Sequence, residues 1–102
     1  MRLVLTTVPK DKSVNLADAI LESKLAGCII SVPLEFSKFL WKGNIEEEQE
    51  TLLIFKTRKE LVKKLFEEIK KNHPYSVPFI SEIKIESMTE EYSKWLKEVT
   101  SD

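Results

Sequence analysis

The first half of the chain alternates apolar runs with short polar breaks. Residues 2–8 are mostly apolar or β-branched with little alternation, which predicts a strand buried on both faces. A polar turn at 10–12 follows. Four apolar residues then recur at helical spacing: Val14, Ala17, Leu21 and Leu25. This spacing predicts a helix over about residues 14–26, with Ser13 as N-cap and Gly27 as the left-handed residue after its end.

A long apolar segment, residues 28–41, alternates imperfectly and contains Pro33. A slip in a two-residue period indicates a bulge or bend, and proline places that point at an edge, bulge or break. The sequence Lys-Gly-Asn at 42–44 is typical of a turn. Residues 51–57 return as an apolar strand, so the two segments are expected to form a hairpin.

The second half predicts a helix, a strand and a final helix. Thr57 and Glu60 have the spacing of a capping box, and His73-Pro74 ends the helix that they begin. Residues 79–86 alternate as a half-buried strand, and Thr89 caps the last helix. Each predicted helix has an apolar stripe. The stripe of the first consists of Leu61, Val62, Leu65, Phe66 and Ile69, and that of the last consists of Tyr92, Trp95, Leu96 and Val99.

This order predicts an α+β fold in a single domain over residues 1–102. The sequence β-α-β-β-α-β is that of a ferredoxin-like antiparallel sheet, here with an extra C-terminal helix. Helices would cover one face of the sheet. Four aromatic residues are too many to leave on a wet opposite face, which favours cover by a partner subunit. They are Phe36, Phe39, Trp41 and Phe55.

Composition narrows the function classes. The net charge of −1 argues against nucleic acid and against a polybasic membrane anchor. One cysteine allows no intrachain disulfide, and the chain shows neither a signal peptide nor a membrane span, so we expect a cytoplasmic protein. Lys and Glu occur 14 times each, whereas Gln occurs once, a bias that predicts a thermophilic source.

Candidate metal ligands are few. His73 is the only histidine, and neutral imidazole binds copper and zinc, although the same residue can serve as a helix C-cap. Cys28 suits copper, but a buried inert thiol is the alternative. The acidic run at 46–50 offers oxygen ligands or is a solvated hairpin end. No Gly-rich phosphate loop, nucleophile elbow or catalytic triad order is present, so we expect no enzyme.

Candidate ligand-binding residues are Lys56, Tyr75 and Trp95. Lys56 ends a strand beside Thr57 and Arg58 at a helix N-terminus, where backbone amides suit a small anionic ligand. Ordinary solvation is the alternative for Lys56. Tyr75 and Trp95 can line a pocket, or they can serve core or interface packing.

Five segments follow one another along the chain: Leu25-Ala-Gly-Cys28, Ser37-x-x-x-Trp41-x-Gly43 with its acidic continuation, Leu53-Ile-Phe-Lys-Thr57, His73-Pro-Tyr-Ser-Val-Pro78, and Tyr92-x-x-Trp95. In this order they resemble the motifs of the CutA divalent-cation tolerance family. Two departures remove candidate ligands: Phe79 stands where the family usually has Glu, and Thr6 and Asn72 stand where some members have Cys and His. The resemblance aligns Glu50 with an acidic position of the family.

The resemblance implies a ferredoxin-like subunit in a tight homotrimer, linked to tolerance of divalent cations and of copper especially. It therefore predicts binding of Cu(II) or another divalent cation, with His73, Cys28 and Glu50 as metal ligands. The alternative is a trimeric scaffold or small-ligand sensor, similar in architecture to PII-like signalling proteins, with inter-subunit clefts lined by Lys56, Tyr75 and Trp95.

Overall fold

A computed structural model describes residues 1–100 of the chain. The elements are, in order, β1 (Arg2–Pro9), α1 (Ser13–Glu22), β2 (Cys28–Pro33), β3 (Ser37–Trp41), β4 (Asn44–Glu48), β5 (Glu50–Thr57), α2 (Val62–Asn72), β6 (Ile80–Lys84) and α3 (Glu90–Val99). Short 3-10 turns over Lys10–Lys12 and Lys59–Leu61 precede α1 and α2. The mixed α+β class is therefore as predicted, whereas β2 and β3 replace the single strand predicted over residues 28–41 and β4 is an additional strand.

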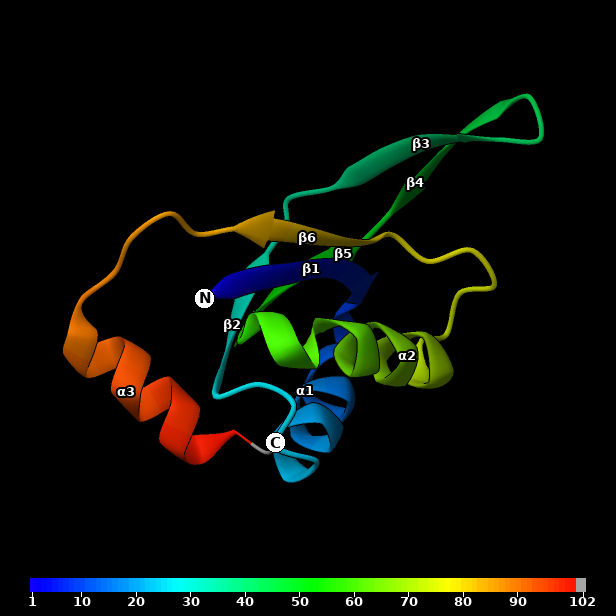
Figure 1. Ribbon diagram of the computed structural model, residues 1–102. Helices are drawn as coiled ribbons and strands as arrows, with labels where there is room; N and C mark the ends of the chain where they lie inside the picture. The colour runs from blue at the N-terminus through cyan, green and yellow to red at the C-terminus, as the bar shows by residue number, and fades with distance from the viewer. Residues whose placement is uncertain (101–102) are drawn as a thin grey trace.

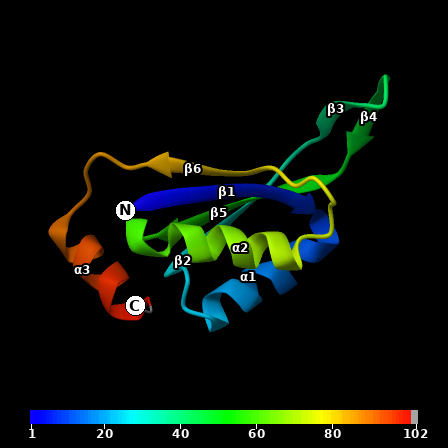
Figure 2. The same ribbon diagram turned by 45° about the vertical axis from the view of Figure 1, so that its right-hand side comes forward.

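The strands form a four-stranded sheet in the order β2-β5-β1-β6 and a separate two-stranded hairpin of β3 and β4. Every pairing is antiparallel. Helices α1 and α2 lie side by side beneath one face of the sheet, and α3 lies beyond its end (Figures 1 and 2). The hairpin projects from the opposite end. No helix within residues 1–100 combines the length and the apolar character needed to cross a membrane.

The core lies between the sheet and the two helices. Alternate residues of β1 and β5 point toward the helices and are almost completely buried. The largest contributors are Val4, Val8, Leu53 and Phe55 from the sheet and Ile20, Leu61, Leu65 and Ile69 from the helical segments. Phe55 is one of them, so its expected place on the opposite, wet face was wrong.

Helix α1 differs from its prediction at both ends. Ser13 is its first residue rather than its N-cap, and the Ser13 hydroxyl donates a hydrogen bond to the Lys10 carbonyl. The helix ends at Glu22, and Lys24 rather than Gly27 takes the left-handed conformation, with φ of 59°. Gly27 lies further on, where its backbone N–H donates to the Lys56 carbonyl.

The capping box predicted for the second helix is also wrong, because the Thr57 hydroxyl donates to the Leu25 carbonyl instead. Arg58 occupies the cap position of the 3-10 turn and makes no side-chain cap. The end of α2 before His73 is as predicted. Thr89 caps α3 as predicted, because its hydroxyl accepts a hydrogen bond from the Tyr92 N–H.

The long strand predicted over residues 28–41 is two strands with a break between them. β2 pairs with β5, and its last residue is Pro33, which lies on the edge strand of the sheet as proline requires. β3 instead pairs with β4, a strand formed by the acidic run. The turn between them places Lys42 and Gly43 at positive φ.

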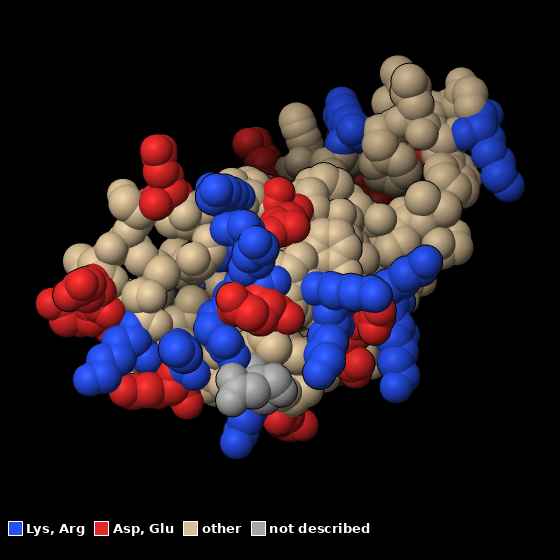
Figure 3. Space-filling model, in the orientation of Figure 1, with Lys and Arg blue, Asp and Glu red and all other residues tan. Residues whose placement is uncertain are grey.

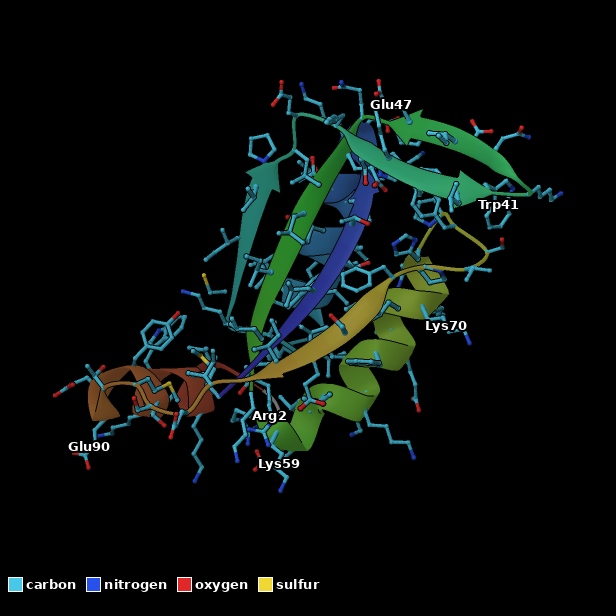
Figure 4. All side chains as sticks on the ribbon, turned by 90° about the horizontal axis from the view of Figure 1, so that it is seen from above. Arg2, Trp41, Glu47, Lys59, Lys70 and Glu90 are labelled. Atoms are coloured by element: carbon cyan, nitrogen blue, oxygen red, sulfur yellow. The ribbon has the colours of Figure 1, made fainter. Side chains whose placement is uncertain are left out.

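The sheet face opposite α1 and α2 is also apolar. Residues directly opposite one another in a sheet share a face, so the registers place Ile30, Ile54 and Leu5 in one row and Val32 and Leu52 in the next. Figure 4 looks onto this face and shows the strands in front of the two helices. We call it the open face, and its apolar members are Leu3, Leu5, Ile30, Val32, Leu52, Ile54 and Ile83.

Candidate functional site

The projecting hairpin has two chemically different faces. Its register pairs Phe39 with Glu46 and Ser37 with Glu48, so aromatic and acidic side chains share the inner face. The outer face carries Leu40 and Ile45, which are largely exposed. Uncharged atoms dominate the hairpin in the view of Figure 3, whereas acidic and basic side chains mix over the helices below it.

The inner face of the hairpin forms one wall of a cleft of about 660 Å³. The loop between α2 and β6 forms the opposite wall, and Thr7 and Glu50 contribute from the ends of β1 and β5. The full lining is Thr7, Ser37, Phe39, Trp41, Glu46, Glu48, Glu50, Pro74, Tyr75, Ser76, Val77 and Phe79. Segments distant in sequence therefore meet at this cleft.

His73 anchors the loop wall of the cleft. The Tyr75 N–H donates to Nδ1 of the imidazole at 3.1 Å, so the ring proton is on Nε2. Nε2 lies 3.0 Å from the Thr7 carbonyl and 3.0 Å from the Thr6 hydroxyl. That hydroxyl in turn donates to the Phe79 carbonyl at 2.7 Å. Both ring nitrogens are thus engaged in fixing the loop against β1.

Tyr75 connects the loop to Glu50. Its hydroxyl donates a 2.8 Å hydrogen bond to Oε2 of the Glu50 carboxylate. Glu50 is only 6% exposed, and no buried side-chain nitrogen or oxygen within residues 1–100 lacks a hydrogen-bond partner. Since Glu50 also lines the cleft, Tyr75 holds its carboxylate at the edge of that space.

Burial and negative charge determine the titration of the two loop residues. Burial lowers the pKa of His73 below 6.5, although the hydrogen bond to the Thr7 carbonyl and the charge of Glu50 oppose that shift. Burial, the hydrogen bond to Glu50 and the charges of Glu50 and Glu48 raise the pKa of Tyr75 far above its ordinary value. At neutral pH the imidazole is therefore neutral and the phenol keeps its proton.

The predicted metal ligands divide between two places. His73 and Glu50 lie together near the cleft, where Tyr75 contacts both. Cys28 pairs with Lys56 at the other end of β5, about 20 Å away by the rise of a strand, and it is half-buried. Across residues 1–100 no three His, Cys, Asp or Glu side chains are grouped closely enough to hold a metal ion.

Within one subunit the predicted ligand-binding residues lie at two places. Nζ of Lys56 lies 5.1 Å from the centre of the Tyr92 ring, and that ring lies 5.3 Å from Trp95. Lys56 and Trp95 therefore flank one aromatic side chain on α3, whereas Tyr75 lies at the cleft. The neighbours of Lys56 are engaged as well, since Thr57 is fully buried and Nε of Arg58 donates to the Thr100 hydroxyl.

Sequence reasoning singled out Glu50 but did not separate Glu46 and Glu48 from the rest of the acidic run. It treated residues 46–50 as one run with a solvated hairpin end as the alternative, although Glu46, Glu48 and Glu50 repeat every two residues. That period places alternate side chains of a strand on one face, and it is the signal that could have identified them. Thr6 and Thr7 carried no such signal, because their partner His73 is 66 or more positions away in sequence.

A family profile described as "CutA1 divalent ion tolerance protein" matches residues 2–99. The divalent-cation tolerance protein CutA of Thermotoga maritima is 38% identical over 96% of this chain and 97% of its own. The corresponding protein of Thermus thermophilus is 40% identical over 96% of each chain.

Solved structures agree with these sequence matches. CutA1 from Pyrococcus horikoshii superposes with a TM-score of 0.95 at 35% identity and covers 100% of both chains. The divalent cation tolerance protein from Thermus thermophilus gives a TM-score of 0.91 at 40% identity over 99% of this chain and 100% of that one. Sequence and fold therefore identify the same relatives over the whole chain.

Proposed function

We propose, given that this chain belongs to the CutA1 divalent ion tolerance family, that it acts in divalent-cation tolerance as a homotrimer. The sheet order β2-β5-β1-β6, with two helices on one face, supports a ferredoxin-like subunit for that assembly. The single observation that carries the proposal, beyond family membership, is the apolar open face.

The open face gives a physical reason to assemble. Its apolar row of Ile30, Ile54 and Leu5 crosses three strands, and Ile83 extends the apolar surface onto β6. Burial of apolar surface contributes about 25 cal/mol per Å², so contact between open faces would stabilise an oligomer substantially. The exposed apolar residues of the hairpin, Leu40 and Ile45 among them, add surface that a neighbouring copy would cover.

Light scattering after size-exclusion chromatography tests the assembly. At micromolar concentration we expect a mass three times that of the 11.9 kDa chain. Ile30→Glu places a charge on the open face at an exposed edge-strand position, so we expect it to give the one-chain mass with an unchanged circular dichroism spectrum. Lys63→Glu, on the outer surface of α2, is the matched control and should keep the three-chain mass. A wild-type protein of one-chain mass would refute the proposal.

Copper binding stays a prediction, and the hydrogen bonds of His73 bear on which residues would be the ligands. A metal ion at either ring nitrogen would displace the Tyr75 N–H or the bond to Thr7. We therefore propose that cation tolerance does not use His73 as a ligand. Titration of Cu(II) into His73→Gln and wild type should give equal affinities; a loss of roughly tenfold or more in the variant would return His73 to the metal site.

A second candidate function is the binding of a small ligand, and the observation that favours it is the cleft. Its volume of about 660 Å³ lies within the range of small-molecule sites, and its lining combines aromatic side chains with a few polar groups. An increase in melting temperature on addition of a ligand would support this candidate, because binding to the native state alone stabilises it.

A further inference from the structure

We propose that α3 is a strap that opens and closes independently of the core and covers the end of the open face where Cys28 pairs with Lys56. This inference concerns the motion of one helix and does not depend on the proposed role in cation tolerance. Three features of α3 support it: its separation from the core, the exposure of its apolar stripe, and the place where it is attached.

Helix α3 lies apart from the core. Figures 1 and 2 show it beyond the end of the sheet, after a segment at 85–89 that forms neither helix nor strand. Leu96 is its one buried residue, and Leu96 is not a member of the continuous cluster that the sheet shares with α1 and α2. By contrast, α2 buries Leu65 and Ile69 within that cluster. Opening of α3 would therefore leave the core intact, and such units open at a lower free energy than the whole protein.

The apolar stripe of α3 is only partly covered within one subunit. Trp95 is 40% exposed and Val99 is 38% exposed, although both lie on the same side of the helix as Leu96. A helix of ten residues is not stable in water by itself, so α3 depends on the contacts of this stripe. Because much of the stripe already faces water, opening α3 costs less than the loss of a fully packed helix would.

The attachments of α3 lie at the ends of two neighbouring strands. A Cβ at Gly27, just before β2, would lie 2.7 Å from Cδ1 of Leu96 and 3.4 Å from Cζ3 of Trp95, so the helix rests directly on the backbone there. At the end of β5, Nζ of Lys56 lies 5.1 Å from the centre of the Tyr92 ring. A cation over a ring at a partly exposed position is a weak attraction, so one small buried contact is the main anchor of the strap.

The covered end of the open face contains the thiol of the chain. Cys28 and Lys56 are directly opposite one another, and alternation along β2 and β5 places both on the face of Ile30 and Ile54. Helix α3 contacts the neighbours of Cys28 on two sides, Gly27 along the chain and Lys56 across the strands. Cys28 is half-buried in this closed state. Opening of α3 would expose the thiol and release the Lys56 ammonium from Tyr92.

Labelling of Cys28 with N-ethylmaleimide tests the proposal, because Cys28 is the only cysteine of the chain. The full assembled chain is used at neutral pH without denaturant, and mass spectrometry follows the reaction. Leu96→Ala removes the buried anchor of α3, so we expect the labelling rate to rise roughly tenfold or more. Leu65→Ala makes the same change within the core and leaves the contacts of α3 in place, so it should be labelled at the wild-type rate.

Amide hydrogen exchange gives a second readout that does not require a reagent to reach the thiol. In wild type we expect the amides of α3 to exchange at least roughly tenfold faster than those of α2, because α2 is part of the core. Leu65→Ala should accelerate exchange in α2 but not in α3. If Leu65→Ala does not fold, Phe66→Ala, at a half-buried position of α2, replaces it in both experiments.

Four results would overturn the proposal. An equal increase of the labelling rate in Leu96→Ala and Leu65→Ala would mean that α3 opens only together with the core. Wild type labelled as fast as the urea-unfolded chain, or as fast as Leu96→Ala, would mean that α3 does not cover Cys28. Amides of α3 that exchange as slowly as those of α2 would mean that the helix does not open separately.

Discussion

The middle of β5 is apolar on both faces, but the two faces have very different surroundings. Leu53 and Phe55 point toward the helices and are at most 1% exposed. Leu52 and Ile54 alternate with them, point to the open face and remain partly exposed. The apolar residues in the middle of the strand are suited to burial on both sides, but one chain supplies helices for only one of them. The difference teaches that the covered face folds the subunit, while the open face is available to organise an assembly.

Phe55→Ala should produce the largest effect on stability. It removes a completely buried aromatic side chain from the covered face, so we expect a loss of about 3–5 kcal/mol in the free energy of unfolding, measured by urea denaturation. Ile54→Ala is the paired change on the open face. At concentrations low enough to dissociate the oligomer it should cost less than about 1.5 kcal/mol, and its cost should grow with protein concentration. If both variants lost the same free energy of unfolding at every protein concentration, the two faces would not differ in their role.

Tyr75→Phe should have the next largest effect. The change removes the hydroxyl that donates to the Glu50 carboxylate and leaves a buried charge without its hydrogen bond. We expect a loss of about 1.5–3 kcal/mol in the free energy of unfolding at neutral pH. Tyr92→Phe is the matched control, because the Tyr92 hydroxyl makes no hydrogen bond to any part of residues 1–100, and its cost should stay within about 0.5 kcal/mol. A silent Tyr75→Phe would show that the hydroxyl does not stabilise Glu50.

Gly27→Ala tests how firmly α3 closes the other end of the sheet. A Cβ at this position would lie 2.7 Å from Cδ1 of Leu96 and 3.0 Å from Cγ2 of Val99. The helix must shift to admit it, so we expect a loss of about 1–3 kcal/mol with a lowered melting temperature. Since Gly43 has open space around it but a positive φ, Gly43→Asn provides a control that tests backbone rather than packing and should cost little.

Local patterns predicted the elements of the fold because their causes are local. Helix α2 carries its apolar stripe and its terminating His73-Pro74 within a few residues, and its end was predicted correctly. The capping box at Thr57 failed because a distant partner, the Leu25 carbonyl, takes the hydroxyl that the local rule assigned to the helix. Gly27 was assigned to a left-handed turn, but what requires glycine there is the packing of α3.

The candidate site was predictable only in part. The sequence identified Tyr75, His73 and Glu50, yet not that one hydrogen-bonded chain joins them, because that contact depends on the meeting of β1, β5 and the loop after α2. It also grouped Tyr75 with Lys56 and Trp95 in a cleft between subunits; within one subunit Lys56 and Trp95 lie far from Tyr75, so that grouping stays a prediction about the assembly. Residue types are local information, and the distances between them follow from the topology.

The pH dependence of stability should be the smallest effect, and its sign follows from the burial of His73. Because burial lowers the pKa of the folded-state imidazole below 6.5, the unfolded chain takes up a proton at a higher pH than the folded chain does. The contribution of His73 to stability is therefore complete above pH 6.5 and declines as the pH falls toward the lowered pKa. Protonation of Nδ1 would also break the hydrogen bond that this atom accepts from the Tyr75 N–H. The loop wall of the cleft would then open, while the core would stay packed.

Urea denaturation between about pH 8 and about pH 5 measures this effect. We expect the free energy of unfolding of wild type to be level at the upper end and to decline below pH 6.5. His73→Gln cannot titrate, so it should lose that part of the decline and keep only the contribution of carboxylates at lower pH. Because the imidazole holds the cleft loop and not the hydrophobic core, Phe55→Ala should shift the whole curve downward without changing its shape. A wild type that gains stability as the pH falls through this interval would contradict the buried, neutral state of His73.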